Sequence, residues 1–191
     1  MKISWSDTSD HQFFQTFTDS GNREHMYFSS GNQLRFYCVD GGSTAAYFDT
    51  NRKFRDPNAW YHIVIACDTT QSTASDRVKI YINGVQETSF ATATYPAQDF
   101  TFRLNTNSQS TVIGRYMGSN DFYYDGIISH YHFIDGTQYA ASDFGSFDST
   151  TGEWKINTNP NVTYGNNGWF LFKDNASVTD QSGEGNNWTT T

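Results

Sequence analysis

The sequence predicts an all-β protein, a two-sheet antiparallel jelly-roll sandwich with a C-terminal extension. Three observations support this fold class. Short segments of alternating apolar and polar residues are separated by turns rich in Gly, Asn, Ser and Thr. The pair Asn83-Gly84 follows one of these segments directly, and it readily adopts the positive φ angles of a tight hairpin. Helical periodicity is nearly absent along the chain.

The two segments around residues 60–83 are the most informative part of the chain. Residues 60–68 are apolar on both alternating faces, which is typical of a strand in the middle of a sheet that is covered on both sides. In residues 77–83 the apolar side chains alternate, with Val78, Ile80 and Ile82 expected to face the core.

The same reasoning assigns the remaining elements in chain order. Strands are expected near residues 2–5, 12–18, 25–29, 34–39, 44–49, 60–68, 77–83, 99–104, 110–115, 122–134 and 168–173. One short helical turn is expected at residues 140–144. Beyond Phe147 the chain becomes rich in Gly, Asn and Thr. We therefore expect a sandwich over residues 1–147 and, over residues 148–191, a C-terminal extension that packs on the sandwich or completes its edge.

Composition limits the possible functions. A chain of 191 residues suffices for one sandwich, and its 16 Phe, 12 Tyr and 5 Trp predict a core of few, large side chains. A net charge of −8 with only 12 Lys and Arg argues against nucleic acid as a partner. No apolar run reaches the roughly 18 residues of a membrane span. No signal peptide precedes the first expected strand, so we expect release without secretion, as by host lysis, or prior removal of a leader.

Several motifs, taken in order, resemble a known family. Trp60-Tyr61-His62 is followed by Asp68, then by the Ile80–Gly84 segment, and Ile113-Gly114-Arg115 leads to residues 124–135. This order and spacing resemble the laminin G-like domains of the concanavalin A-like lectin superfamily. The resemblance implies a concanavalin A-like sandwich that binds carbohydrate or protein.

Four further motifs are more specific: residues 54–60, 133–136, 142–145 and 180–186. They resemble a branch of this family found in structural proteins of tailed bacteriophages, marine ones especially, which implies a place in the virion. The N-terminal part departs from the family, which usually has an extra strand before the first Trp-containing one. Residues 168–174 and 180–186 resemble the start of such a domain, so they either supply that first strand in permuted order or begin a second domain.

Catalysis is not expected. Enzymes that cut glycosidic bonds need two carboxyl groups flanking the bond, and the four glutamates, Glu24, Glu87, Glu153 and Glu184, lie in different segments. His130 and His132 would share one strand face, but no third ligand for a metal ion is apparent, so we interpret them as a surface pair. Cys38 and Cys67 are either two small buried thiols or a disulfide between strands, and the sequence leaves both open.

Calcium is the expected ion. Residues 180–186 place side-chain oxygens around two glycines, a composition that suits a hard cation. Asp180 and Asn186 are the expected ligands. Gly/Asn/Asp loops also form plain turns, which is the alternative for this segment.

Aromatic residues beside Asn and Asp predict a carbohydrate site. Sugar rings stack on aromatic faces while neighbouring polar groups bind their hydroxyls. The expected ligand-binding residues are Tyr116, Asn120, Asp121, Tyr123 and Tyr47. The chain is therefore predicted to be a non-enzymatic virion module, in a tail fibre or head fibre, that contacts host surface glycans as a homo-oligomer or part of a larger assembly. The alternative is a structural decoration or cement protein that binds only other virion proteins.

Overall fold

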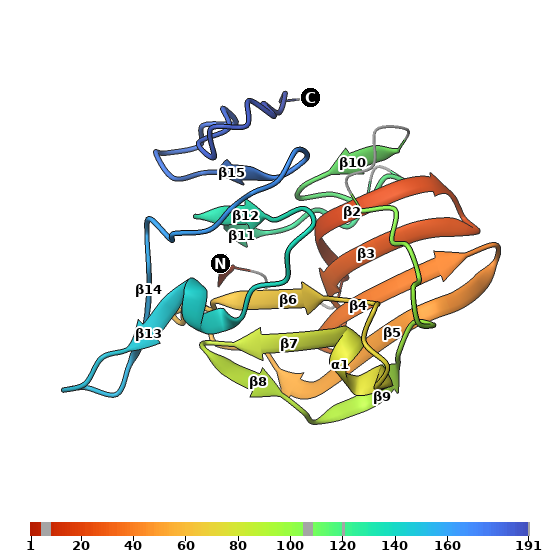
Figure 1. Cartoon of the computed structure of the whole chain (residues 1–191), viewed down its shortest axis with the longest axis horizontal. Helices are drawn as coiled ribbons and strands as arrows, with labels where there is room; N and C mark the ends of the chain where they lie inside the picture. The colour runs from red at the N-terminus through yellow and green to blue at the C-terminus, as the bar shows by residue number, and fades with distance from the viewer. Residues whose placement is uncertain (5–8, 105–108, 120, 191) are drawn as a thin grey trace.

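The computed structural model describes residues 1–4, 9–104, 109–119 and 121–190 and consists mainly of two layers of β-strands (Figure 1). The larger layer is a six-stranded antiparallel sheet. Its strands, in spatial order, are β10 (Ser110–Val112), β2 (His11–Asp19), β3 (Asn22–Phe28), β4 (Gln33–Asp40), β5 (Ser43–Lys53) and β9 (Phe90–Thr94).

The second layer contains a three-stranded sheet, in the order β6 (Ile63–Cys67), β7 (Val78–Ile82) and β8 (Val85–Glu87). The short helix α1 (Ala74–Arg77) precedes β7. Asn83 and Gly84 join β7 to β8 with φ angles of 48° and 78°, the positive values that a two-residue hairpin requires. Val78, Ile80 and Ile82 are all buried, as their alternation predicts.

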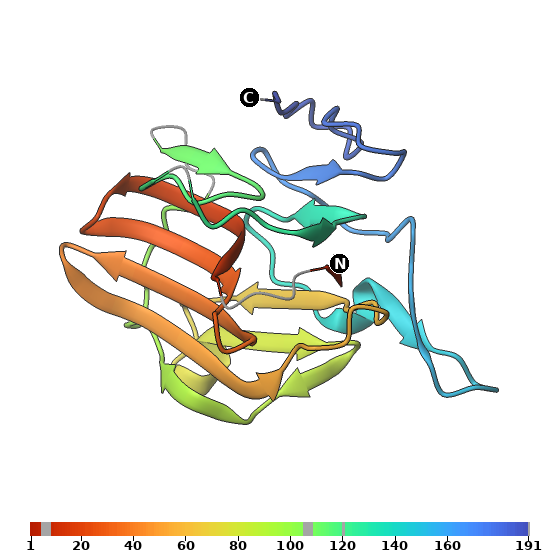
Figure 2. The same cartoon turned by 180° about the vertical axis from the view of Figure 1, so that it is seen from behind.

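Short strand pairs extend this second layer. β1 (Lys2–Ile3) pairs with β11 (Gly126–Ile127), and β12 (Tyr131–Phe133) pairs with β15 (Trp169–Leu171). β1 also bridges from Lys2 to Trp60, so it lies between the residues that lead into β6 and β11. In Figures 1 and 2 the N-terminus accordingly lies between β6 and the β11–β12 segment.

The remaining elements follow β12. The 3₁₀ helix η1 (Ala141–Asp143) lies where the sequence predicts a helical turn. β13 (Gly145–Phe147) and β14 (Trp154–Ile156) then form an antiparallel hairpin, which projects from the sandwich (Figure 1).

Aromatic side chains fill the space between the layers. Phe36 stacks on Phe48 with ring centroids 6.2 Å apart, and Phe14 contacts Trp169 of β15 at 6.2 Å. Nearly all regular structure is antiparallel strand, which confirms the predicted fold class.

Three strand predictions were wrong in detail. β6 has one strand neighbour, β7, among the described strands, although its sequence predicts a central strand. The predicted strand at 122–134 is divided into β11 and β12, because His130 has a φ of 49° and interrupts the extended backbone. Residues 99–104 form no strand; Phe102 packs on Phe36, with ring centroids 5.5 Å apart.

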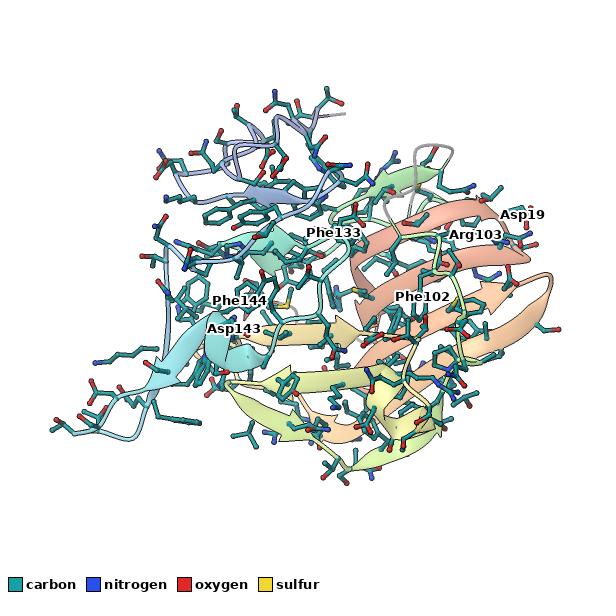
Figure 3. All side chains as sticks on the ribbon, viewed as in Figure 1. Asp19, Phe102, Arg103, Phe133, Asp143 and Phe144 are labelled. Carbon is teal, nitrogen blue, oxygen red and sulfur yellow. The ribbon has the colours of Figure 1, made fainter. Side chains whose placement is uncertain are left out.

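A polar cluster holds the 99–104 segment against the larger sheet. The backbone N–H of Arg103 donates to Oε1 of the buried Glu24 at 2.9 Å, and the guanidinium bonds to Asn22 and Asp40. Figure 3 shows Phe102 and Arg103 side by side on this segment. The neighbouring Cys38 is a free thiol, as is Cys67, so the structure contains no disulfide between them.

Candidate functional site

The outer face of the six-stranded sheet carries a continuous set of aromatic and charged side chains. Met26 of β3 and Phe36 of β4 are paired in register and contact the core. Because side chains alternate along a strand, their neighbours point to the opposite, outer face. These neighbours are Arg23, His25 and Tyr27 on β3 and Arg35 and Tyr37 on β4. In Figure 2 this face of β3–β5 is turned toward the viewer.

A row of rings crosses this face. Tyr116 stacks on His25, with ring centroids 5.4 Å apart and planes 24° from parallel. His25 contacts Tyr37 at 6.1 Å, and Tyr37 contacts Tyr47 at 5.1 Å. The structure therefore places Tyr116 and Tyr47 on the same surface, with His25 and Tyr37 between them.

The loop that carries Tyr116 is fixed by backbone hydrogen bonds to the sheet edge. The N–H of Met117 donates to Oε1 of Gln15 at 2.6 Å, and the N–H of Gln12 donates to the carbonyl of Phe122 at 3.2 Å. Both glutamines belong to β2. Tyr116 is thus positioned over β2 and β3 by groups of the sheet itself.

Several buried polar atoms on this face have no hydrogen-bond partner among the residues that the structure describes. They are Gln12 Oε1, Arg23 Nε, His25 Nε2 and Arg35 Nε, and Asp49 Oδ1 on β5 is a fifth. A buried polar atom without a partner costs about 1–3 kcal/mol, so such atoms are rare in folded proteins. Such atoms call for a partner that the described residues do not supply, such as a bound water or ligand.

The charged side chains of this face contact one another and the neighbouring rings. Arg35 bonds to Asp49 at 3.0 Å and lies over the ring of Tyr27, and Arg23 lies over the ring of Tyr37. Burial, reinforced by the nearby Arg23, lowers the pKa of His25 to about 3, so the imidazole is neutral at physiological pH. A neutral imidazole, tyrosine rings and guanidinium groups can stack on and hydrogen-bond a ligand.

A second surface contains the other predicted residues. A groove of about 810 Å³ is lined by Tyr123, Asn167, Asn186 and Trp188, among others. Tyr123 is 55% exposed, and its carbonyl lies 3.1 Å from Nδ1 of His11. The structure therefore brings Tyr123 and Asn186 to one groove, on a different part of the surface from Tyr116 and Tyr47. Asp121 is exposed, and Asn120 lies outside the described residues.

The predicted calcium loop is held together by its own hydrogen bonds. Asp180 accepts bonds from the N–H groups of Phe170, Ser182 and Asn186, at 2.8 to 2.9 Å. Partial burial acts to raise the pKa of Asp180, but these bonds outweigh it and lower that pKa. Asn186 donates to the carbonyl of Gly168 at 2.8 Å. Within the described part of the chain, no group of three or more His, Cys, Asp or Glu could hold a metal ion, and calcium stays a prediction.

His130 and His132 take part in packing. His132 stacks on Phe170, with ring centroids 4.0 Å apart, and its Nδ1 lies 2.8 Å from the hydroxyl of Tyr164. His130 contacts the same Phe170 at 5.8 Å. Burial, with the neighbouring His130 as a further cause, lowers the pKa of His132 to about 3.

Sequence reasoning missed His25, Tyr37 and the two arginines of the outer face. A signal for them existed, because Arg23, His25 and Tyr27 alternate with residues that face the core. The expected strand began only at residue 25, so the alternation was cut short. The proximity of His25 to Tyr116, which follows much later in the chain, is a result of the fold.

Comparison with known proteins identifies the family. The family model described as the concanavalin A-like lectin/glucanases superfamily matches residues 1–142, and the chain belongs to this family. The comparisons with curated proteins and with solved structures found no match. Among the described residues, no helix has the length and apolar character needed to cross a membrane.

Proposed function

We propose that the chain is a non-enzymatic carbohydrate-binding module whose ligand lies on the outer face of the six-stranded sheet. Domains of this family often bind carbohydrates or proteins. The observation that carries the proposal is the row Tyr116, His25, Tyr37 and Tyr47 beside the unpartnered polar atoms of the same face. A sugar ring offers a C–H face for stacking and hydroxyls for hydrogen bonds, so it satisfies both parts of the surface.

The proposed binding is weak for one site and stronger for many. A shallow face that takes one or two sugar rings binds with a Kd near the millimolar range, or roughly 4 kcal/mol. Several copies on one assembly raise the apparent affinity about a hundredfold or more without a new contact. The module is therefore proposed to act as a homo-oligomer or within a larger assembly.

The proposed location is a bacteriophage virion, in a tail fibre or head fibre, with a host surface glycan as the ligand. The support is the resemblance of residues 54–60, 133–136, 142–145 and 180–186 to structural proteins of tailed phages. Electron microscopy of particles labelled with an antibody against this chain tests the location. Label on fibres agrees with the proposal, and virions without any label contradict it.

The alternative function is a decoration or cement protein that binds other virion proteins. The projecting β13–β14 hairpin favours it, because Phe147 and Ile156 expose 52% and 41% of their surface there. Exposed apolar side chains on a projecting element are typical of protein interfaces. This alternative predicts no glycan binding and a contact of about 1,000 Å² or more with another virion protein.

A glycan array that includes bacterial surface polysaccharides, probed with a multimerised form of the chain, distinguishes the two functions. Tyr47→Ala and Tyr123→Ala form a matched pair of truncations on the two candidate surfaces. We expect Tyr47→Ala to remove binding and Tyr123→Ala to retain it, with the melting temperature unchanged in both.

Each other outcome points to a different conclusion. A different result would be that the unaltered chain binds only when calcium is present and that Tyr123→Ala alone loses this binding. The ligand would then lie in the groove of Tyr123 and Asn186 instead. If the unaltered chain binds no polysaccharide on the array, with or without calcium, the carbohydrate proposal is contradicted. The structural role then remains.

A further inference from the structure

The two arginines on the outer face of the six-stranded sheet differ in what surrounds them. Arg35 lies opposite Asp49 and bonds to its carboxylate at 3.0 Å. Arg23 lies opposite Phe17 on one side and Val39 on the other, and neither of these side chains is charged or accepts a hydrogen bond. Among the described residues no carboxylate forms an ion pair with Arg23. One positive charge on this face therefore has no counter-ion in the described part of the chain.

The outer side chains form three rows across the strands. Neighbouring rows lie about 7 Å apart, because side chains on one face of a strand recur at every second residue. Taken across β2 to β5, the rows are Phe17, Arg23 and Val39; then Gln15, His25, Tyr37 and Tyr47; then Gln12, Tyr27, Arg35 and Asp49. The middle one belongs to the row of rings described above. We call the two outer ones the Arg23 row and the Arg35 row.

The hydrogen bonds of Gln15 determine which nitrogen of His25 carries the proton. The N–H of Met117 donates to Oε1 of Gln15 at 2.6 Å, so the amide nitrogen of Gln15 is the atom that faces the imidazole. This nitrogen can only donate, and it lies 3.4 Å from Nδ1 of His25. Nδ1 is then the acceptor of the neutral ring, and Nε2 carries the proton. Because Nε2 is buried and has no partner among the described residues, it is a donor without an acceptor.

Arg23 supplies a second donor of this kind beside the first. Its Nε is buried and has no hydrogen-bond partner in the described part of the chain, and a guanidinium nitrogen can only donate. The guanidinium carbon lies 5.7 Å from the ring centroid of Tyr37, and the centroid of the His25 ring lies 6.1 Å from the same point. Two donors without acceptors therefore border one tyrosine ring. A carboxylate or sulfate group, whose oxygens only accept, satisfies such donors, and its charge balances that of Arg23.

The Arg35 row offers a different set of groups. Gln12 Oε1 and Asp49 Oδ1 are buried acceptors, and Arg35 Nε is a buried donor, all without a partner among the described residues. A sugar hydroxyl both donates and accepts, so hydroxyls can satisfy all three atoms. Gln12 and Asp49 lie three strands apart, roughly 14 Å at about 4.8 Å per strand, so more than one sugar unit is needed to reach both. The face thus fits a chain of sugars with an anionic group on one side of the row of rings and hydroxyls on the other.

We propose that the ligand of this face is an acidic polysaccharide, and that its anionic group, a carboxylate or a sulfate, binds Arg23 and His25. The inference rests on the proposed carbohydrate-binding function and names the class of sugar. Hydroxyls of the same and of neighbouring sugar units bind the Arg35 row. A neutral sugar would leave the charge of Arg23 without a counter-ion. The net charge of −8 repels acidic polymers in general, so their binding to this chain requires a local cation such as Arg23.

Matched pairs of polysaccharides test the charge of the ligand without any mutation. Bacterial surface polysaccharides that contain uronic acids are printed on an array, each beside its carboxyl-reduced form, and dextran sulfate is printed beside dextran. The multimerised chain is then applied. We expect at least one acidic polysaccharide to bind at least tenfold more strongly than its uncharged counterpart. The kind of pair that shows this difference identifies the anionic group as a carboxylate or a sulfate.

Two variants that change the net charge equally test the role of Arg23. Arg23→Gln should reduce binding of the acidic polysaccharide at least tenfold, with the melting temperature unchanged. Lys155→Gln is the control, because the side chain of Lys155 is 59% exposed on the projecting β13–β14 hairpin, and it should bind like the unaltered chain. Arg23→Lys keeps the charge but lacks the Nε donor and the planar fork of the guanidinium, so we expect it to restore binding only in part.

The outcomes separate this inference from the proposed function on which it rests. If the chain binds polysaccharides but the acidic and uncharged members of every pair bind equally, the acidic ligand is overturned and the carbohydrate-binding function remains. An equal loss of binding in Arg23→Gln and Lys155→Gln shows a general effect of charge and also overturns it. If no polysaccharide binds, the carbohydrate-binding function is itself contradicted, and the acidic ligand with it. The comparison of matched polysaccharides stands even if Arg23→Gln does not fold.

Discussion

The two layers of the sandwich differ in how completely their strands are paired. In the six-stranded sheet, β2, β3, β4 and β5 each have a strand on both sides. In the other layer, among the longer strands that the structure describes, only β7 has a strand on both sides, and β6 pairs with β7 alone along residues 63–67. Both layers contribute to the same aromatic core. The two layers therefore share one hydrophobic core, but the strands of the six-stranded sheet are more completely hydrogen-bonded than those of the other layer.

This difference suggests a division of roles. A fully paired sheet is rigid and can hold the row from Tyr116 to Tyr47 in a fixed arrangement, which a ligand-binding face requires. A layer with an open edge is suited to assembly, because an unpaired edge tends to bind another strand. The proposed glycan face accordingly lies on the fully paired layer.

The largest effect should come from removing the C-terminal strand of the incomplete layer. In β15, Trp169 is 1% and Leu171 0% exposed, and Trp169 contacts Phe14 and Phe133 of the sandwich. Truncation after Phe147 should expose these partners and the edge of β12, and lead to aggregation. Size-exclusion chromatography and thermal melting measure the outcome. A soluble, monomeric truncation as stable as the parent would show that residues 148–191 belong to another domain.

The next largest effect should come from a charge in the core that both layers share. Ile80 is 1% exposed at the centre of β7. Ile80→Asp buries an unpaired carboxylate at a cost of several kcal/mol, comparable with the 5–15 kcal/mol of stability that is typical of a domain, so we expect an unfolded protein. Val85→Asp is the control, because Val85 is 54% exposed in the next strand and should change the unfolding free energy by less than about 0.5 kcal/mol. Circular dichroism and urea titration distinguish the two.

Local pattern was enough to predict the fold class. The alternation of Val78, Ile80 and Ile82 and the turn at Asn83-Gly84 depend on neighbouring residues only. The open edge of β6 could not be predicted in this way, because a strand with one neighbour and a strand with two can have the same apolar pattern. It depends on how the layer is assembled from segments far apart in the chain.

The candidate site was less accessible to sequence reasoning. Tyr116 and Tyr47 were predicted as ligand-binding residues, but the groups between them, His25 and Tyr37, come from two other strands. Their contact depends on the register of β3 against β4 and on the path of the loop after β10. Tyr123 is seven residues from Tyr116 and yet lines the other groove, because the intervening loop turns from the sheet face toward the C-terminal segment.

A moderate effect is expected on acidification, which tests how tightly both layers are packed. Burial lowers the pKa of His25 to about 3 in the larger sheet, and it lowers that of His62 to about 4 and of His132 to about 3 in the other layer. Below about pH 6.5 the unfolded chain therefore binds more protons than the folded one, so stability falls as the pH falls. For one such group the free energy of unfolding can change by at most about 1.4 kcal/mol per pH unit.

Urea denaturation at intervals between pH 6.5 and pH 5 measures this slope. Burial lowers the pKa of the Met1 amine to about 5, which acts in the same direction, whereas burial raises the pKa of Glu24, which acts in the opposite one. Asp148, whose pKa is lowered to about 2 by Lys155 and nearby N–H groups, loses its contribution only at lower pH. His132→Phe should reduce the slope. A stability that is constant across this range would contradict the neutral, buried state of these histidines.

The smallest expected effect is a difference in amide hydrogen exchange between the two layers. Measuring it requires no mutation, so the unfolding free energy is unchanged. In β4, backbone N–H groups on both sides bond to β3 and β5, so all interior amides should exchange slowly with deuterium. In β6, Val64 and Ala66 direct their N–H groups to β7, whereas Ile63, Ile65 and Cys67 direct theirs away from it. NMR should show these three amides exchanging at least about tenfold faster than the two others. Equal protection of both sets in the isolated chain would show that β6 already pairs along its whole length, and the two layers would then be equally complete.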